Sequence, residues 1–195
     1  MKNKPYVVCI SAWVAGGKTT AVNELLARLP DSKAIFFDNY NNITWKSFPR
    51  ENYYQWSVNG NDYNDWNLEP IICDIEKALN EEIEYIILEL PMGNANEAVS
   101  KYIDCTVFLD VPVDVLLARC IMRDYCNRPA HKKKLDNPLE SLNGWLAEYI
   151  AYSRITVFNY INAVKPYADL IVDGNQPAEK IADVILQHIN NKRLT

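Results

Sequence analysis

Two glycines, a lysine and two threonines stand side by side near the start of the chain, and this group could bind phosphate. Glycine lets the backbone approach a ligand closely. A helix is expected to begin at the lysine, where backbone N–H groups lack partners within the helix and the helix dipole is positive. A polyphosphate supplies the missing acceptors and the complementary charge. The predicted nucleotide-binding residues are Ala12, Trp13, Val14, Ala15, Gly16, Gly17, Lys18, Thr19 and Thr20.

The elements on either side of this segment are those that a phosphate loop requires. Tyr6 to Ile10 is an apolar run that predicts a buried strand. After the loop, apolar residues recur at helical spacing from Val22 to Leu29. Strand, glycine-containing loop, Lys-Thr and helix, in this order, form a P-loop. The standard pattern begins with glycine where this chain has Ala12, but both glycines beside the lysine remain.

Two carboxylates follow predicted strands, at the edge where ligands of a parallel sheet bind. Asp38 follows a short strand predicted from Ala34 to Phe37, and Glu89 ends a strand predicted from Tyr85 to Leu90. Asp38 is therefore placed to meet a molecule beside the phosphates, although Asp is also common in turns for local reasons. Glu89 resembles a Walker-B acid, which holds Mg²⁺ directly or through water. The alternative for Glu89 is a strand-end acid in contact with solvent.

Arg119 and Arg123 lie four residues apart on a helix that is predicted to begin at Pro112, so they share one face. A basic loop and another helix follow, and this order predicts a lid at about residues 119–137. Closure of such a lid would bring cationic groups onto a transferring phosphoryl group and exclude water. The alternative is a solvated helix face, and the lysine run at 132–134 is more typical of an exposed surface.

Residues 39–68 form a long segment that is rich in polar and aromatic side chains and shows little periodicity. A long irregular segment in a compact domain is often a functional loop. Its rings could stack on a substrate and its aspartates could bind hydroxyl groups. A small core or a dimer surface is the alternative, because aromatic residues serve both. The predicted substrate residues, with the strand-end acid included, are Tyr40, Asp62, Asp65, Trp66 and Glu89.

The composition is that of an ordinary globular protein. The 195 residues fit a single domain, 1–195, with 49% hydrophobic and 23% charged residues. The net charge of −5 argues against nucleic acid as the main partner. We find no stretch that is long and apolar enough to span a membrane. Five scattered cysteines without a CxxC pair favour reduced thiols in the cytoplasm over disulfides or a zinc site.

The rest of the chain continues the alternation of strands and helices. Further strands and helices are predicted at about 69–79, 95–101, 105–109, 138–164, 169–172 and 177–189. In the long helix that begins at Pro138, apolar residues such as Leu139 and Leu146 recur at helical spacing and are expected in the core. This alternation predicts an α/β fold with a parallel sheet that is covered on both faces.

Five segments match, in order, those of one group of known proteins. The specific ones are the phosphate loop and the Arg119–Asp124 helix, which is similar to an Arg-x-x-x-Arg-Asp lid helix. The weaker ones are Phe37-Asp38-Asn39-Tyr40, Ile87-Leu88-Glu89 and the segment from Val164 to Val172. With these segments, which cover most of its length, the chain resembles the uridine kinase and phosphoribulokinase-like P-loop kinases. The resemblance implies a three-layer sandwich: a five-stranded parallel sheet, helices on both faces and a helical lid.

The resemblance also implies roles for individual residues. Lys18 would contact the β- and γ-phosphates of ATP, and Thr19 would ligate Mg²⁺. Asp38 would orient or deprotonate the acceptor hydroxyl, and Glu89 would support the metal or the substrate. The two arginines of the lid helix would stabilise charge on the transferred group.

The predicted function is ATP- and Mg²⁺-dependent phosphoryl transfer to a hydroxyl of a small metabolite, by a cytoplasmic enzyme that could form a homodimer. A nucleoside monophosphate kinase is a close variant, but residues 39–68 offer only Lys46 and Arg50 to an acceptor phosphate. The alternative of another class is a regulatory or interaction protein that binds nucleotide without transferring a phosphoryl group. A base and a lid argue against it, because binding alone needs neither.

Overall fold

Five parallel strands form one sheet in the order β2-β3-β1-β4-β5. The computed structural model describes residues 4–40, 44, 52–127 and 134–194. The strands are β1 Tyr6–Ser11, β2 Ser32–Phe36, β3 Tyr85–Glu89, β4 Cys105–Asp110 and β5 Leu170–Asp173. Each strand is followed by helical structure before the chain returns to the sheet, which is the connection that parallel strands need.

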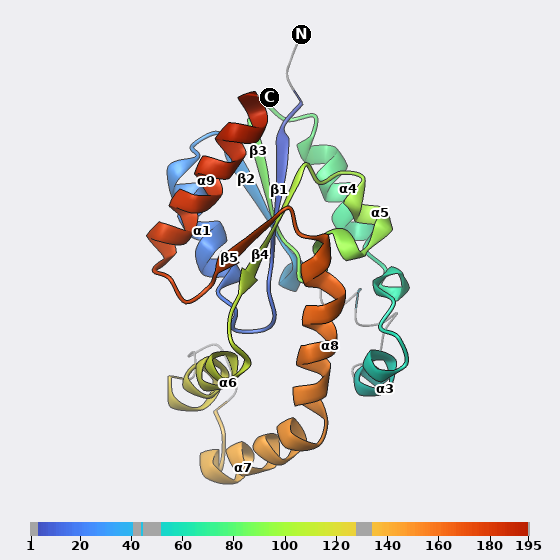
Figure 1. Cartoon of the computed structure of the whole chain (residues 1–195), viewed down its shortest axis with the longest axis vertical. Helices are drawn as coiled ribbons and strands as arrows, with labels where there is room; N and C mark the ends of the chain where they lie inside the picture. Colours follow the sequence, from blue (N-terminus) through green and yellow to red (C-terminus); the bar gives the residue numbers. More distant parts are fainter. Residues whose placement is uncertain (1–3, 41–43, 45–51, 128–133, 195) are drawn as a thin grey trace.

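Helices cover both faces of this sheet, as Figure 1 shows. On one face lie α1 Lys18–Arg28 and α9 Ala178–Leu194. On the other lie α4 Glu69–Ala78, α5 Glu97–Ser100 and α8 Arg154–Val164. The predicted α/β sandwich with a five-stranded parallel sheet is therefore confirmed.

The alternation of side chains along the central strand divides the core in two. Val8 and Ile10 of β1 pack with residues of α1 and α9, such as Leu25. Their neighbours Val7 and Cys9 point to the opposite face and pack with residues of α4 and α8. Such two-sided burial explains why the strand is an unbroken apolar run in the sequence.

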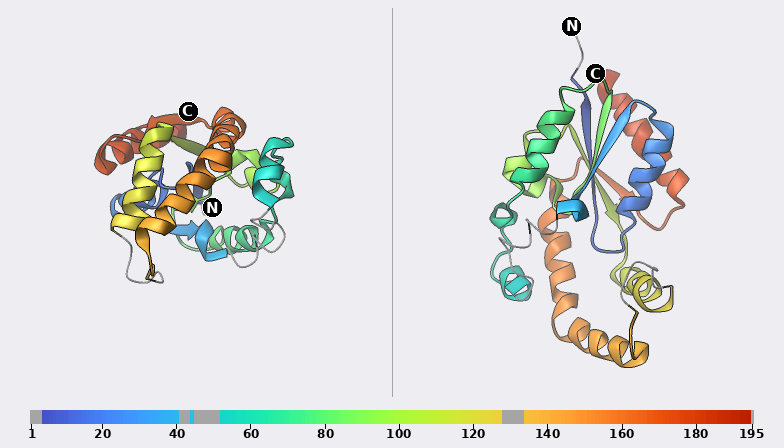
Figure 2. Two further views of the ribbon diagram at one scale, coloured as in Figure 1. Left: turned by 90° about the horizontal axis from the view of Figure 1, so that it is seen from below. Right: turned by 180° about the vertical axis from the view of Figure 1, so that it is seen from behind.

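The carboxyl ends of the strands point to the end of the molecule that lies opposite the two chain termini (Figure 1). The loop after β1, the helix α6 Val113–Ile121 and the short helix α3 Tyr53–Val58 all lie at this end. From α6 the chain passes through a π-helical turn, Met122–Cys126, and reaches α7 Pro138–Glu148. A second π-helical turn, Tyr149–Ser153, joins α7 to α8. These segments form a helical arm that extends from the sheet (Figure 2). The predicted lid, residues 119–137, overlaps only part of this arm, and its role as a lid stays a prediction.

Two expectations about packing are wrong in part. The predicted helix over 138–164 buries only part of its apolar stripe: α7 has no buried residue and Leu139 is 79% exposed, whereas Val157 in α8 is buried. The reason is that α7 extends beyond the sheet. Its aromatic side chains contact other parts of the arm there; for example, the ring of Trp145 contacts that of Tyr125. Residues 39–68 are also more regular than predicted, because α3 and a 3-10 turn at Tyr63–Asp65 lie within them.

None of the helices in the described residues is long and apolar enough to cross a membrane. The five cysteines all lie within the described residues and form no disulfide there, and Cys9, Cys105 and Cys120 are buried.

Candidate active site

The loop after β1 has the backbone conformation of an anion-binding loop. Ala15 and Gly17 both have left-handed backbone angles, with φ of 61° and 90°. Such turns aim successive N–H groups at one point. The side chain of Lys18 folds back over the loop, and its Nζ donates to the carbonyls of Ala12 and Trp13 at 3.0 and 3.3 Å. The loop therefore gathers N–H groups and a cation, which is what binding a polyphosphate requires.

Ala12, which stands where the standard pattern has glycine, is accommodated by Gly16. The Ala12 side chain is fully buried. A Cβ added to Gly16 would lie 2.6 Å from the Cβ of Ala12 and 2.8 Å from the carbonyl oxygen of Trp13. The methyl group of Ala12 thus occupies the space left by the missing Cβ of Gly16. The loop can therefore keep its shape with alanine at the position where the standard pattern has glycine.

Thr19 and Glu89 bring two oxygen groups together beside this loop. The Thr19 hydroxyl donates to the Glu89 carboxylate, with Oγ1 3.1 Å from Oε1 and 3.0 Å from Oε2. Burial raises the pKa of Glu89, which is only 7% exposed, although Lys18 and Thr19 act in the opposite direction. A hydroxyl and a carboxylate are the oxygen ligands that Mg²⁺ prefers, so the pair fits this metal. Within the described residues, no group of three or more His, Cys, Asp or Glu could hold a metal ion.

Asp38 lies in a 3-10 turn, Phe37–Tyr40, directly after β2, and it shares one electrostatic environment with the loop. Burial lowers the pKa of Lys18, and the carboxylates of Glu89 and Asp38 partly reverse this effect. Arg123 lowers the Lys18 pKa further. The three charged groups come from three elements far apart in the sequence, yet all of them shift the pKa of the same lysine. The electrostatic influence of all three groups therefore reaches Lys18, and Glu89 contacts Thr19, the residue that follows this lysine.

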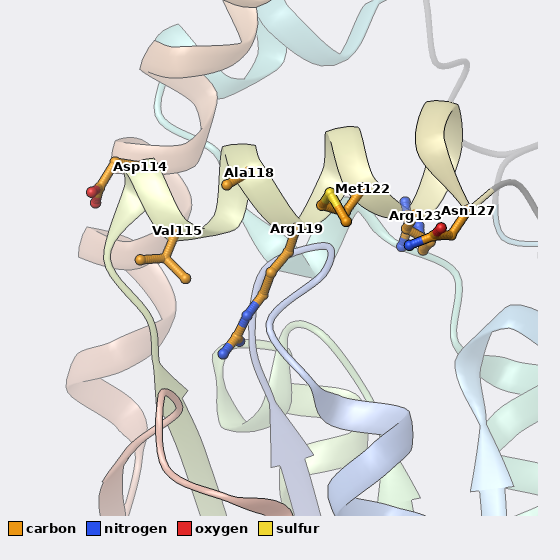
Figure 3. Close-up of a pocket in the computed structure, with 7 residues that line it drawn as sticks. All are labelled: Asp114, Val115, Ala118, Arg119, Met122, Arg123 and Asn127. Atoms are coloured by element: carbon orange, nitrogen blue, oxygen red, sulfur yellow. The ribbon is translucent and has the colours of Figure 1, made fainter.

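The two predicted lid arginines have different surroundings. Arg123 donates to Asp124 through Nε at 3.1 Å and Nη2 at 2.6 Å, and this contact is the main reason why its pKa is raised. Arg119 donates instead to the carbonyl of Gly174, at 3.1 Å, in the turn after β5. Figure 3 shows Arg119 extending from α6 toward the loop after β1.

A cavity of about 420 Å³ lies along this helix. Its lining residues are Asp114, Val115, Ala118, Arg119, Met122, Arg123 and Asn127 (Figure 3). The cavity is therefore bordered by both predicted cationic groups. Part of the predicted lid, residues 128–133, lies outside the described residues.

The predicted substrate residues of the aromatic segment have contacts within the protein. Asp62 accepts from the backbone N–H of Asn64, and Asp65 accepts from Trp56 Nε1 at 2.9 Å. Trp66 is 5% exposed and belongs to the core. The Tyr40 hydroxyl donates to Asp74 of α4 at 2.6 Å. These contacts give the four residues a structural part, and their contact with a substrate stays a prediction.

An aromatic cluster joins the phosphate loop to the predicted acceptor side. The ring of Trp13 lies 4.9 Å from that of Tyr160 on α8 and 6.4 Å from that of Tyr53 on α3. The Tyr53 ring in turn stacks on Trp56 at 5.3 Å. Sequence reasoning assigned Trp13 to the loop but missed Tyr160, because a tyrosine at helical spacing gives no signal beyond core packing.

Known proteins with kinase activity resemble this chain. It is 24% identical to a uridine-cytidine kinase B from Dictyostelium discoideum over 96% of the chain and 82% of that protein. It is 28% identical to a uridine kinase from Borrelia turicatae over 85% of each. A uridine kinase-like protein 5 from Arabidopsis thaliana is 24% identical over 97% of the chain, which spans 43% of that longer protein. No protein-family model matches the chain.

Solved structures show the same fold. A Silicibacter structure described as a fructose transport system kinase has a TM-score of 0.58 and 17% identity, covering 87% of the chain and 90% of its own. Shikimate kinase from Acinetobacter baumannii has a TM-score of 0.52 and 18% identity, covering 100% and 97%.

The fold, the phosphate loop and these relatives define a P-loop kinase. The chain is a small-molecule kinase of this class, and the relatives confirm the resemblance to uridine kinases that its motifs predicted.

Proposed function

We propose that the chain transfers the γ-phosphoryl group of ATP, with Mg²⁺, to a hydroxyl of a pyrimidine nucleoside such as uridine or cytidine. The acceptor is chosen because these relatives carry uridine or cytidine in their names. The aromatic cluster around Trp13 and Tyr53, whose rings are partly buried, supports a flat acceptor, since aromatic rings favour stacking.

One observation carries the proposal: the Lys18 ammonium lies over the carbonyls of the phosphate loop, directly beside the Thr19–Glu89 pair. Asp38, Glu89 and Arg123 all influence the pKa of this lysine. Phosphoryl transfer depends on positioning and on neutralising charge more than on covalent chemistry. Lys18 would hold the phosphates, and Arg123 would balance charge on the group in transfer. Asp38 would orient the acceptor hydroxyl and accept its proton.

Thr19 and Glu89 would hold Mg²⁺ beside the phosphates. The ion, when bound, would neutralise charge on the nucleotide oxygens. A kinase usually binds Mg²⁺ through one or two protein oxygens together with substrate phosphates. The two oxygen groups at the loop fit that arrangement.

The proposal is tested by mixing the purified chain with ATP, Mg²⁺ and one acceptor at a time. The acceptors are uridine, cytidine, other nucleosides, sugars and nucleoside monophosphates. We expect ADP release that depends on uridine or cytidine, with the phosphorylated nucleoside identified by mass spectrometry. Release that depends only on a monophosphate would favour the nucleoside monophosphate kinase variant. ATP binding without release in any mixture would favour a binding protein.

Asp38→Asn tests the role of the base. The variant should bind ATP as the wild type does and should transfer about a hundredfold more slowly, because general bases contribute about 10² to 10⁴ in rate. Asp31→Asn is the matched control. Asp31 is an exposed acid that directly precedes β2, so it lies at the end of this strand opposite Asp38. Full transfer by Asp38→Asn would remove Asp38 from the proposal. The cytoplasmic location and the homodimer remain predictions.

A further inference from the structure

The turn that carries Asp38 is anchored on both sides of this residue. Phe37 is 6% exposed, and its ring lies 6.1 Å from that of Trp66 in the core. Tyr40, at the other end of the turn, donates its hydroxyl to Asp74 Oδ2 at 2.6 Å. Asp38 itself is exposed between these two anchors.

The hydrogen-bond partner of Tyr40, Asp74, lies on α4, a helix that is fixed by packing in the core. This helix buries Ile71 and Ile75 against the sheet, at 2% and 0% exposure. Asp74 stands on the same helix, and its second oxygen, Oδ1, accepts from Lys77 at 2.7 Å. The carboxylate is therefore held by two donors on a helix that cannot shift without disturbing the core.

Both partners of this hydrogen bond keep their charge states near neutral pH. Burial and the bond to Asp74 raise the pKa of Tyr40, so the phenol remains protonated and remains a donor. The contacts with Lys77 and Tyr40 lower the pKa of Asp74, so the carboxylate remains ionised and remains an acceptor. A bond from a hydroxyl to a carboxylate is among the stronger hydrogen bonds in proteins.

We propose that Tyr40 and Asp74 are positioning residues, which fix the turn so that Asp38 presents its carboxylate to the acceptor hydroxyl. The inference rests on the role of Asp38 in the proposed function. The buried Phe37 ring and the Tyr40–Asp74 hydrogen bond tie the turn to the core on both sides of Asp38, so these anchors fix where its backbone lies. A misplacement of about 1 Å can cost on the order of a hundredfold in rate.

Tyr40→Phe is the direct test, because it keeps the ring and removes only the hydrogen bond. With ATP and uridine, we expect kcat to fall about tenfold while the KM for ATP changes less than about twofold. Tyr102→Phe is the matched control. The Tyr102 hydroxyl also donates to a carboxylate of α4, that of Glu76, but Tyr102 lies beyond α5 and not in the turn. Its kcat should stay within about twofold of the wild type.

A double-variant cycle separates positioning from a general loss of structure. If Tyr40 acts through Asp38, Tyr40→Phe should have less than about a twofold effect in an Asp38→Asn background. Single-turnover assays at high enzyme concentration keep these slow variants measurable. A tenfold effect of Tyr40→Phe in both backgrounds, or no effect in the wild type, would overturn the inference. Wild-type transfer by Asp38→Asn alone would instead overturn the proposed base.

A second measurement does not depend on activity. Hydrogen exchange should become faster in peptides that cover Phe37–Tyr40 when Tyr40 is changed to Phe or Asp74 to Ala, because the turn loses its anchor. Tyr102→Phe should leave exchange in that turn unchanged. Unchanged exchange in the Tyr40 and Asp74 variants would show that the bond does not hold the turn, whatever the acceptor proves to be.

Discussion

The Thr19 hydroxyl donates its hydrogen to the Glu89 carboxylate, with Oγ1 about equally far from both carboxylate oxygens, at 3.1 and 3.0 Å. The two residues are brought together because β1 and β3 are neighbours in the sheet, with Ile10 paired to Glu89. A hydroxyl that gives its hydrogen to one group keeps its lone pairs for another. Glu89 therefore orients the Thr19 oxygen as an acceptor, which is the orientation a cation needs.

Thr19→Val should raise the Mg²⁺ concentration that gives half-maximal activity by about tenfold or more. Removing a group around a bound metal typically lowers the metal affinity by this factor. Valine keeps the shape of the side chain but removes the oxygen. Thr19→Ser, which keeps the hydroxyl, is the control and should stay near the wild type. The measurement is a Mg²⁺ titration of initial rate at fixed ATP. Equal Mg²⁺ requirements for Val and Ser would contradict the assignment of Thr19 as a metal ligand.

Glu89→Gln should stabilise the protein at neutral pH. Because burial raises its pKa, the folded protein binds the Glu89 proton more tightly than the unfolded chain does. This contribution to stability is fully present below the ordinary carboxyl pKa and is lost as pH rises through the raised one. Glutamine stays neutral throughout, so the melting temperature of the variant should exceed that of the wild type at pH values above that window.

Calorimetry from pH 4 to 8 without added nucleotide checks this prediction. The difference between variant and wild type should be near zero at the acid end and should grow as pH rises. The same variant should transfer phosphoryl poorly, because a neutral amide binds Mg²⁺ less well than a carboxylate. A melting temperature that falls below that of the wild type at pH 7 would mean that the Glu89 charge stabilises the fold.

Gly16→Ala should abolish nucleotide binding. The new methyl group would meet the Cβ of Ala12 at 2.6 Å and the Trp13 carbonyl at 2.8 Å, and this carbonyl also accepts from Lys18. Gly144→Ala is the control, because a Cβ there has nothing within 4 Å and lies on a helix, where alanine is favoured.

Adding Ala12→Gly to Gly16→Ala removes one of the two clashes and should restore part of the binding. Titration of ATP by calorimetry measures all four proteins, the wild type included. ATP binding by Gly16→Ala that equals the wild type would show that the loop can shift to admit the methyl group. In that case Ala12 and Gly16 would not be the matched pair that the structure indicates.

The fold and the charged residues of the site were predictable because both follow from local patterns. Buried parallel strands are unbroken apolar runs, and the residue after each one lies at the ligand-binding edge of the sheet. This reasoning predicts that Asp38 and Glu89 lie beside the phosphate loop, and in the structure Glu89 accepts a hydrogen bond from Thr19 of that loop's helix. Most element boundaries differ from the predicted ones by one or two residues, as is usual for helix and strand ends.

Contacts between distant segments were not predictable in this way. The bond from Tyr40 to Asp74 joins residues that are 34 positions apart, and a single sequence carries no signal for it. The exposure of Leu139 was also missed, because helical periodicity shows that a stripe is apolar but not what covers it. A signal did exist for the partner of Arg119: Gly174 follows the last strand, at the same edge as Asp38 and Glu89.

Arg123→Ala and Arg119→Ala should affect different kinetic constants. In the proposed function Arg123 balances charge on the transferred group, so its loss should lower kcat about a hundredfold, the size of effect that one group stabilising transition-state charge can have. Arg119 is bonded to the turn after β5 and lines the cavity under α6, so its loss should chiefly raise the KM for ATP, by about tenfold. Steady-state kinetics with ATP and uridine separates the two effects.

Lysine at each position is the control for charge alone, because it keeps the cation but lacks the planar fork of arginine. If both alanine variants lower kcat equally with no change in KM, the two arginines act as one unit on the transferred group, and the division that their different contacts indicate is wrong.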